Sequence, residues 1–431
     1  MSSLIPVAIA LAAGLLMTRV VKVLHLNFPD VTAFLLAGLA IGPFGLGKLG
    51  INGLGFDSLE ALDAVGVIPT VALGFIAFAI GNEFRLSQLK ETGKQAAVIG
   101  VLQAVVATLV VDGALFVLHL ILGEETLPLS GVITLGAIAA ATAPAATLMV
   151  VRQYKAKGKL TDLLLPIVAL DDAVGLVVFA VSFGIAQAMV GGAMSVSSVL
   201  VEPLVEIAAS LILGSVMGVL LTLLEKLFFS NTNRLSLTIS FVLLTIALAE
   251  MEFPLGNLTL RFSSLLVCMM LGTIFCNLCP RSGDIMDRAD KWTAPVYALF
   301  FVLSGAELDL SLFSNLAVAG IGVAYVLSRS AGKYLGARGS AKLMHCDHKV
   351  QKYLGITLLP QAGVALGMSA QASSLGTTEG RMIRNITLFG VLIYELFGPM
   401  LTRWALEKAG EIAPKSPDKE SHARFDKARA R

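Results

Sequence analysis

Charge-free apolar intervals, each long enough to cross a bilayer, recur along almost the whole chain. A transmembrane helix needs about 20 mostly apolar residues. Only 14% of the residues are charged and 56% are hydrophobic, with a mean hydropathy of +0.82, whereas soluble proteins carry about 25% charged residues. This excludes a water-soluble enzyme, a disordered chain and a disulfide-rich secreted domain, and the net charge of +2 gives no support to a nucleic-acid partner. The sequence predicts an all-α polytopic membrane protein without a cofactor.

The intervals predict about thirteen transmembrane helices. Because the first interval has no preceding basic residues and no cleavage-like site, we expect it to be a retained helix rather than a signal peptide. The intervals centre on residues 3–18, 31–47, 64–82, 95–111, 126–151, 160–189, 203–224, 235–249, 262–280, 292–306, 315–336, 353–375 and 385–405.

The placement of lysine and arginine predicts the orientation, because cytoplasmic loops hold the excess of these residues. With the N-terminus outside, inside loops and the tail collect 27 of the 32, and outside loops hold only Lys48, Arg261, Arg381 and Arg384. Arg329 falls within a predicted span. We therefore expect a protein of the cell (inner) membrane with a cytoplasmic C-terminus. Its polar tail, residues 407–431, is predicted to be disordered.

Two segments separated by 224 residues match, which is typical of transporters built from inverted halves. Gly, Glu, Leu and Ser coincide between 81–87 and 305–311. Pro144 has a counterpart in Pro360, and Asp171 has one in Glu395. The sequence predicts a transmembrane domain over residues 1–406, with repeats over roughly 60–190 and 290–406.

A proline interrupts the middle of one predicted span in each half. Pro144 lies between Thr142 and Thr147, and it removes a hydrogen bond and clashes with the carbonyl one turn earlier. Freed carbonyls and the two hydroxyls are suitable ligands for a cation, while a simple kink among small residues is the structural alternative. Pro360 repeats the arrangement with Gln361 beside it. Two interrupted helices in matching positions indicate a transporter binding site.

The adjacent carboxylates Asp171 and Asp172 lie near the middle of the span 160–189. Placing one carboxylate there costs about 2.5 to 3.5 kcal/mol on insertion scales, so two need a compensating reason. Their side chains diverge by about 100°, which lets one face a cavity and the other a neighbouring helix. A carboxylate that is either protonated or bound to a hard cation is what proton-for-cation exchange requires. A neutral, hydrogen-bonded structural pair is the alternative.

These motifs resemble those of the bacterial cation:proton antiporter superfamily, and the paired aspartates resemble its sodium/proton branch. Besides the paired aspartates and the prolines, the resemblance rests on residues 300–309, 328–337 and 359–367. It implies a homodimer with a dimer domain and a mobile core, in which two broken helices cross beside the aspartates. Carried over by position, Asp172 binds the transported cation (Na⁺, with Li⁺ or K⁺ as alternatives) and the proton. Asp171 matches the residue that pairs with a basic residue on the eleventh helix.

Two departures from the family pattern affect the site. The eleventh span offers Arg329 and Lys333 in place of one central lysine, and we choose Arg329 as the partner of Asp171 because it lies deeper in the predicted span. An arginine does not release its proton. Ala143 stands where many relatives carry an acidic residue, which leaves one ligand fewer.

Other candidates are weaker. Glu395 could pair within the core, and Asp112 is expected to be a solvated or hydrogen-bonded edge residue. A cysteine pair, Cys276 and Cys279, and the segment 345–348 carry zinc-type ligands, but nothing in the sequence brings them together. The alternatives to sodium exchange are a potassium/proton exchanger of the glutathione-gated efflux type without its nucleotide-binding domain, and a non-transporting membrane sensor. An intramembrane aspartyl protease does not fit adjacent aspartates.

Overall fold

The computed structural model is almost entirely helical. It describes residues 4–24, 26, 28–49, 55–82, 84–190, 202–251, 253–255, 258–260, 262–307 and 316–412. Arg261 and residues 413–431 of the tail lie outside this part, and so does the side chain of Lys48. Within these described residues, six helices are long and apolar enough to cross a membrane by length and composition alone. The chain is thus an all-α polytopic membrane protein, and the number of its spans remains a prediction.

Each predicted span is occupied by a helix or by two short helices. In the first half these are α1 (Leu4–Val23), α2 (Asp30–Ile41), α4 (Val67–Asn82), α5 (Leu86–Leu122), α6 (Leu129–Ile138), α7 (Pro144–Gln153) and α8 (Lys159–Met189). Next come α9 (Glu202–Glu225), α10 (Asn231–Ala249), α11 (Ser264–Leu278), α12 (Ser282–Ala306), α13 (Leu316–Leu343), α14 (His348–Thr357), α15 (Gly363–Gln371) and α16 (Thr377–Ala409). Short connections are η1 (Leu46–Leu49), α3 (Leu59–Asp63), η4 (Ala372–Leu375) and the antiparallel strands β1 (Phe253–Leu255) and β2 (Leu258–Leu260).

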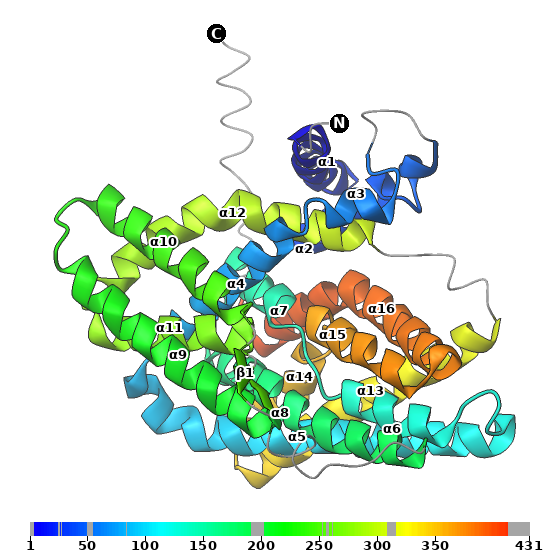
Figure 1. Ribbon diagram of the computed structural model, residues 1–431. Coiled ribbons are helices and arrows are strands. Elements are labelled where there is room, and N and C mark those ends of the chain that lie inside the picture. Colours follow the sequence, from blue (N-terminus) through cyan, green and yellow to red (C-terminus); the bar gives the residue numbers. More distant parts are fainter. Residues whose placement is uncertain are drawn as a thin grey trace.

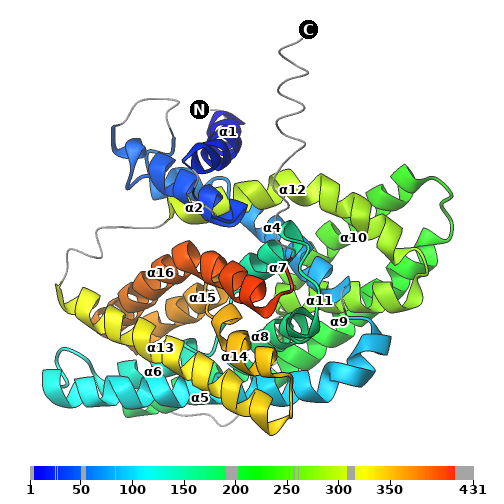
Figure 2. The ribbon, with the colours of Figure 1, turned by 180° about the vertical axis from the view of Figure 1, so that it is seen from behind.

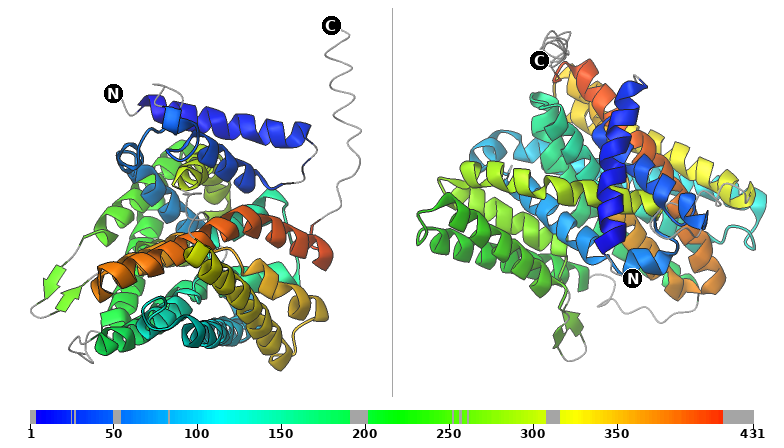
Figure 3. Two further views of the ribbon diagram at one scale, coloured as in Figure 1. Left: turned by 90° about the vertical axis from the view of Figure 1, so that its right-hand side faces the viewer. Right: turned by 90° about the horizontal axis from the view of Figure 1, so that it is seen from above.

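The helices pack as two groups. The site group is α5 to α8 with α13 to α16, and the panel group is α1 to α4 with α9 to α12. Figures 1 and 2 show the site group below and beside the panel, with α9 to α12 at one flank. In Figure 3, α1 lies on the outside of the panel, over α2 and α12. The main contacts between the groups are made by α2, α4, α7, α8, α9 and α16.

The repeated motif marks close helix crossings in the panel. A Cβ at Gly81 would lie 1.9 Å from the Met269 carbonyl oxygen on α11, and one at Gly305 would lie 2.2 Å from the Leu35 oxygen on α2. Such approaches admit only glycine. The element order also repeats, since a long helix, a broken helix and another helix follow α4 and again follow α12. The motif therefore reflects packing that both halves require.

The end of α16 caps the start of α8. The carboxylate of Glu411 accepts hydrogen bonds from the backbone N–H groups of Leu160 and Thr161, at 2.6 and 2.8 Å, and from the Thr161 hydroxyl at 2.7 Å. A negative group is favourable at a helix N-terminus, where backbone N–H groups lack partners. Of the predicted tail, residues 407–409 are the last residues of α16 and Glu411 is held at the start of α8; residues 413–431 lie outside the described part.

Candidate ion site at the crossing of two broken helices

Both proline-containing spans are broken, as the sequence predicts. In the first half α6 ends at Ile138 and α7 begins at Pro144, which occupies the first helical position, where its missing N–H costs nothing. In the second half α14 ends at Thr357 and α15 begins at Gly363, with Pro360 between them. Each break is buried in the site group, so its backbone groups need partners within the protein.

The two breaks supply many of those partners to each other. The backbone N–H of Ala143 donates to the Pro360 carbonyl oxygen at 2.8 Å. The Thr142 hydroxyl donates to the Leu358 carbonyl at 3.3 Å, and the Gln361 amide donates to the Ile138 carbonyl at 2.9 Å. One turn further along α7, the Thr147 hydroxyl donates to the Thr357 carbonyl at 3.4 Å. The residues predicted to support the ion site thus meet at one crossing.

Arg329 on α13 satisfies further carbonyls of both breaks. Its guanidinium donates to the carbonyl oxygens of Ala139 at 3.0 Å, Ala141 at 2.6 Å and Leu359 at 2.7 Å. The side chain is fully buried and lies over the Tyr394 ring, 4.5 Å from its centre. A planar fork of donors suits several fixed acceptors at once. Arg329 therefore joins the two breaks, and among the described side chains it makes no ion pair with Asp171.

Lys333, one turn after Arg329, is the residue that pairs with Asp171. Its ammonium lies 3.0 Å from Asp171 Oδ2 and also donates to the Ala140 carbonyl at 2.6 Å and to the Thr142 hydroxyl oxygen at 2.8 Å. Both side chains of the pair are 0% exposed. The Gln103 amide of α5 donates to the other Asp171 oxygen. Four elements, α5, α8, α13 and the first break, therefore hold this carboxylate.

Our choice of Arg329 as the partner of Asp171 was wrong for a geometric reason. The predicted span 315–336 places Lys333 near its end, but α13 continues to Leu343. Those additional seven residues extend the helix by about 10 Å, so Lys333 lies well inside it.

Asp172 follows Asp171 directly in α8, and its side chain lies outside the described residues. Its helix position can still be placed. Position 172 comes seven residues after Leu165, which is two turns, so the two positions fall on the same face of α8 and about 10 Å apart. Leu165 lines a cavity.

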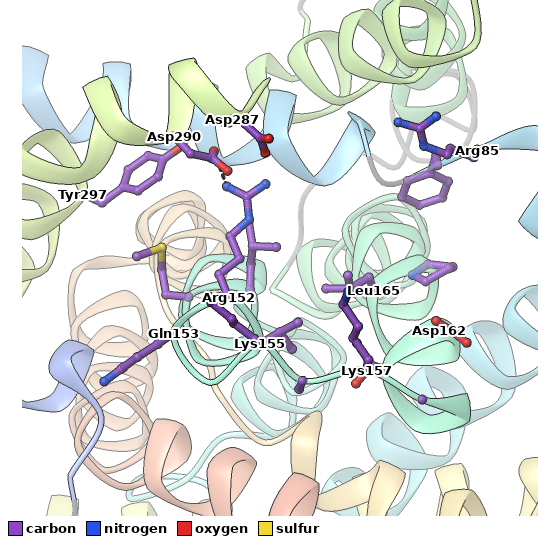
Figure 4. Close-up of a pocket in the computed structure, with 18 of the residues that line it drawn as sticks. Arg85, Arg152, Gln153, Lys155, Lys157, Asp162, Leu165, Asp287, Asp290 and Tyr297 are labelled. Atoms are coloured by element: carbon purple, nitrogen blue, oxygen red, sulfur yellow. Dashed lines mark hydrogen bonds and ion pairs between the residues drawn. The ribbon is translucent and has the colours of Figure 1, made fainter. Parts of the chain in front are cut away.

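That cavity has a volume of about 900 Å³ and lies between the two helix groups (Figure 4). Its walls come from α7 and α8 of the site group, from α12 of the panel and from the connection before α5. In Figure 4 the Arg152 guanidinium reaches across to the Asp290 carboxylate. The charged lining residues are Arg85, Arg152, Lys155, Lys157, Asp162, Asp287 and Asp290. The cavity therefore opens next to the α7–α8 loop, on the side of the molecule that carries Arg152, Lys155, Lys157 and Lys159. We call this the lysine-rich side.

The weaker candidates do not join the site. Glu395 on α16 is 8% exposed and makes no hydrogen bond or ion pair with another described residue, so the predicted pairing is not found. Asp112 on α5 is half-buried and packed against Gly136, and its Oδ1 atom has no hydrogen-bond partner among the described residues. Within the described ranges, no group of three or more His, Cys, Asp or Glu side chains could hold a metal ion.

The sequence reasoning missed Gln103, Tyr325 and Tyr394. Gln103 is fully buried in α5, and an amide in the middle of the apolar interval 95–111 is a usable signal, because buried polar groups in a membrane need partners. Tyr325 shares hydrogen bonds with Gln361, and the Tyr394 hydroxyl donates to the Val326 carbonyl at 2.7 Å. Aromatic residues are common enough in apolar spans that no sequence signal singles these two out.

Comparison with known proteins matches nearly the whole chain to one protein family. Residues 7–408 match the family described as sodium/hydrogen exchanger, transmembrane. A K(+)/H(+) antiporter subunit, KhtU, from Bacillus subtilis is 23% identical over 391 residues, which are 88% of each protein. An ammonium/H(+) antiporter subunit, AmhT, from Alkalihalophilus pseudofirmus is 24% identical over 291 residues, 67% of this chain and 66% of the relative.

Solved structures share the fold. The sodium proton antiporter MjNhaP1 from Methanocaldococcus jannaschii at pH 8 superposes with a TM-score of 0.67 and 21% identity, covering 96% of this chain and 99% of that chain. A second structure of the same antiporter, determined by electron microscopy, gives a TM-score of 0.70 at 19% identity, with coverage of 95% and 98%. The chain therefore has the same overall fold as this antiporter.

Proposed function

The chain belongs to the sodium/hydrogen exchanger family, and we propose that it exchanges sodium for protons by alternating access at the aspartate pair Asp171 and Asp172. It is a multi-pass membrane protein and a cation/proton antiporter, a transporter rather than an enzyme. The identity of the cation, the residues that bind it and the mode of access are our proposal. The observation that carries it is the buried Lys333–Asp171 pair at the crossing of the two breaks.

In this proposal Asp172 binds the cation and the proton in turn. Its position lies on the α8 face that lines the 900 Å³ cavity, which supports access from the lysine-rich side. That side faces the cytoplasm in the orientation we propose, with the N-terminus outside. Carboxylate oxygens suit a hard cation, and carbonyl and hydroxyl groups of the breaks around Thr142 and Thr147 are further oxygen ligands.

Lys333 gives the neighbouring Asp171 a role in the exchange. A lysine can lose its proton when its surroundings change, whereas an arginine cannot. When a cation binds beside the aspartates, it weakens the attraction between Asp171 and the Lys333 ammonium, because like charges repel over short distances. The lysine can then release a proton, so that the pair contributes to exchange together with Asp172.

We further propose two inverted repeats, over roughly residues 60–190 and 290–406, a homodimer and a location in the cell (inner) membrane. The repeated element order after α4 and after α12 supports the repeats. Exposed apolar side chains of the panel helix α1, such as Leu15 and Leu16, support a contact with lipid or with a second copy.

Potassium or ammonium is the second candidate cation. Two relatives are named as subunits of potassium/proton and ammonium/proton antiporters, and this observation favours testing both ions beside sodium. A membrane sensor that keeps the fold without transport is the remaining alternative, and it predicts that no cation dissipates a pH gradient.

Exchange in proteoliposomes tests these proposals. An imposed pH gradient is followed with a fluorescent dye while sodium, lithium, potassium or ammonium is added to the parent and to the Asp172→Asn and Asp171→Asn variants. We expect sodium to dissipate the gradient with the parent and exchange to fall at least tenfold with Asp172→Asn. Asp347→Asn is the matched control, because it neutralises a carboxylate that is paired with Lys159 at the surface of the molecule. Undiminished exchange in Asp172→Asn would show that the site is elsewhere.

A further inference from the structure

Polar links between the two helix groups are concentrated at the end of one short helix. Among the described residues, the site group is joined to the panel by the Arg152–Asp290 ion pair, from α7 to α12, and by a hydrogen bond in which the Asp30 backbone N–H of α2 donates to Gln153 Oε1 at 2.9 Å. Arg152 and Gln153 are consecutive and are the last two residues of α7.

The other end of α7 belongs to the crossing. The helix has ten residues, begins at Pro144 beside the break and carries Thr147 one turn later. It is about 15 Å long, so one short rigid element connects the crossing to the panel. Between its ends, Ala145, Ala146 and Leu148 pack in the same apolar cluster as residues of α4, α11 and α12. Apolar contacts of this kind are non-directional, whereas an ion pair and a hydrogen bond hold one relative position.

We propose that Arg152, through Asp290, is a positioning residue for transport: together with the Gln153–Asp30 bond it forms a latch that holds α7 against the panel while the cavity is open. The inference rests on the proposed alternating access, because it assigns the latch to one of the two states. When the site group moves relative to the panel, the four latch residues separate. The state with the open cavity is then the one that the latch stabilises.

The surroundings of the latch suit a contact that breaks in each cycle. The side chains of Arg152 and Asp290 are 20% and 34% exposed, so water can solvate both charges once they separate. The Lys333–Asp171 pair, with no exposure, has no such access to water. A partly exposed ion pair contributes a modest free energy. It is enough to favour one of two states but not enough to block the change to the other state.

Chemical labelling measures this shift without relying on transport. The four cysteines, Cys268, Cys276, Cys279 and Cys346, are replaced by serine, and Leu165→Cys, on the cavity face of α8, serves as the reporter. A membrane-impermeant maleimide is added to the reconstituted protein from the lysine-rich side. We expect Arg152→Gln and Asp290→Asn each to slow labelling roughly two- to fivefold, since losing a partly exposed pair changes a population by about that factor.

Charge exchange provides the rescue. The double variant Arg152→Asp with Asp290→Arg restores the opposite charges, so we expect its labelling rate to return toward that of the parent reporter. The matched control is Lys159→Gln, which removes an ion pair to Asp347 within the site group and leaves the rate unchanged. Unchanged or faster labelling in both single variants, or no recovery in the double variant, would overturn the latch.

Transport assays keep this test separate from the proposed function. If the parent reporter exchanges cations but the labelling rate does not change in the Arg152 and Asp290 variants, the latch is wrong, while the proposed cation exchange is still supported. If no variant and no parent exchanges a cation, the proposed function fails, while a labelling change that the double variant reverses still demonstrates two states controlled by the ion pair.

Discussion

Two lysine–aspartate pairs in this molecule have nearly the same geometry and opposite surroundings. At the crossing, Lys333 Nζ lies 3.0 Å from Asp171 Oδ2, and both side chains are 0% exposed. On the lysine-rich surface, Lys159 Nζ lies 3.3 Å from Asp347 Oδ2, with exposures of 78% and 38%. The surface pair stays solvated, so forming it costs little and gains little. The buried pair required the desolvation of two charges, a cost that attraction alone often fails to repay.

This difference indicates what each pair is for. The surface pair helps to join the start of α8 to the start of α14, and many polar residues could replace it. A buried ion pair is weak evidence for stability, since apolar residues of similar volume often serve better. Its presence at the crossing is therefore better explained by a need for charge there than by a need for cohesion.

The largest effect is expected from breaking the buried pair on one side only. Lys333→Met leaves the Asp171 carboxylate buried without its cation, and we expect the free energy of unfolding to fall by about 3 to 5 kcal/mol. In Lys333→Met with Asp171→Asn neither charge of the pair is left, and Asn keeps an acceptor for Gln103. We expect most of the stability to return in this double variant but exchange to remain absent, as measured by denaturant unfolding in detergent and by proteoliposome transport.

A small effect of Lys333→Met on stability would mean that the buried pair and the surface pair are energetically alike. If Lys333→Met changed the free energy of unfolding by less than about 1 kcal/mol, the value typical of a surface pair, the burial of the charges at the crossing would not have the consequence we assign to it. Lys159→Met is the matched control, because it removes a lysine from a pair of the same type at the surface.

A smaller loss is expected from Arg329, a buried cation whose partners are carbonyl dipoles. Arg329→Gln removes donors from three carbonyl oxygens in both breaks, and we expect a loss of about 2 to 4 kcal/mol, because hydrogen bonds to charged groups are worth more than neutral ones. Arg329→Lys restores one charged donor and should recover only part of it. Thermal melting in detergent measures the stability of both variants. Full recovery in Arg329→Lys would show that the positive charge is sufficient and that the planar guanidinium with its several donors is not needed.

The smallest effect is expected at Asp347, and it depends on pH. The Lys349 backbone N–H and then the Lys159 ammonium hold the pKa of this carboxyl below its usual range. Because the folded-state pKa is lowered, the stabilisation is complete above the unfolded-state value of about 3.9 and is lost as the pH falls through the folded-state value. We expect Asp347→Ala to lower Tm slightly at pH 6 and to match the parent at the lowest pH. A difference that grows on acidification would contradict this assignment.

Much of the fold could be predicted from the sequence, because its cause is local. Apolar length specifies a span, and a proline inside a span removes a hydrogen bond wherever it occurs, so the breaks at Pro144 and Pro360 were predictable. The partners of the freed carbonyls were not predictable in the same way. They come from α13 and from the other break, up to 223 residues away in sequence, and only packing brings them together.

The partner of Asp171 shows where this kind of reasoning ends. The choice between Arg329 and Lys333 depends on depth in the span, and depth was counted from a boundary that the helix passes by seven residues. Helix boundaries are the least reliable part of a sequence reading. When two candidate partners lie one turn apart on the same helix, as Arg329 and Lys333 do, the three-dimensional structure is needed to tell which one forms the ion pair.

The contact between Glu411 and the start of α8 has a practical consequence for producing the protein. The composition of the chain suggests shortening it after residue 406, where the polar tail begins. A protein that ends there lacks the carboxylate that occupies the first backbone N–H groups of α8, the helix that carries both aspartates. A recombinant form that ends at residue 412, with any affinity tag placed beyond it, keeps that helix end covered and is the better starting material for every measurement proposed above.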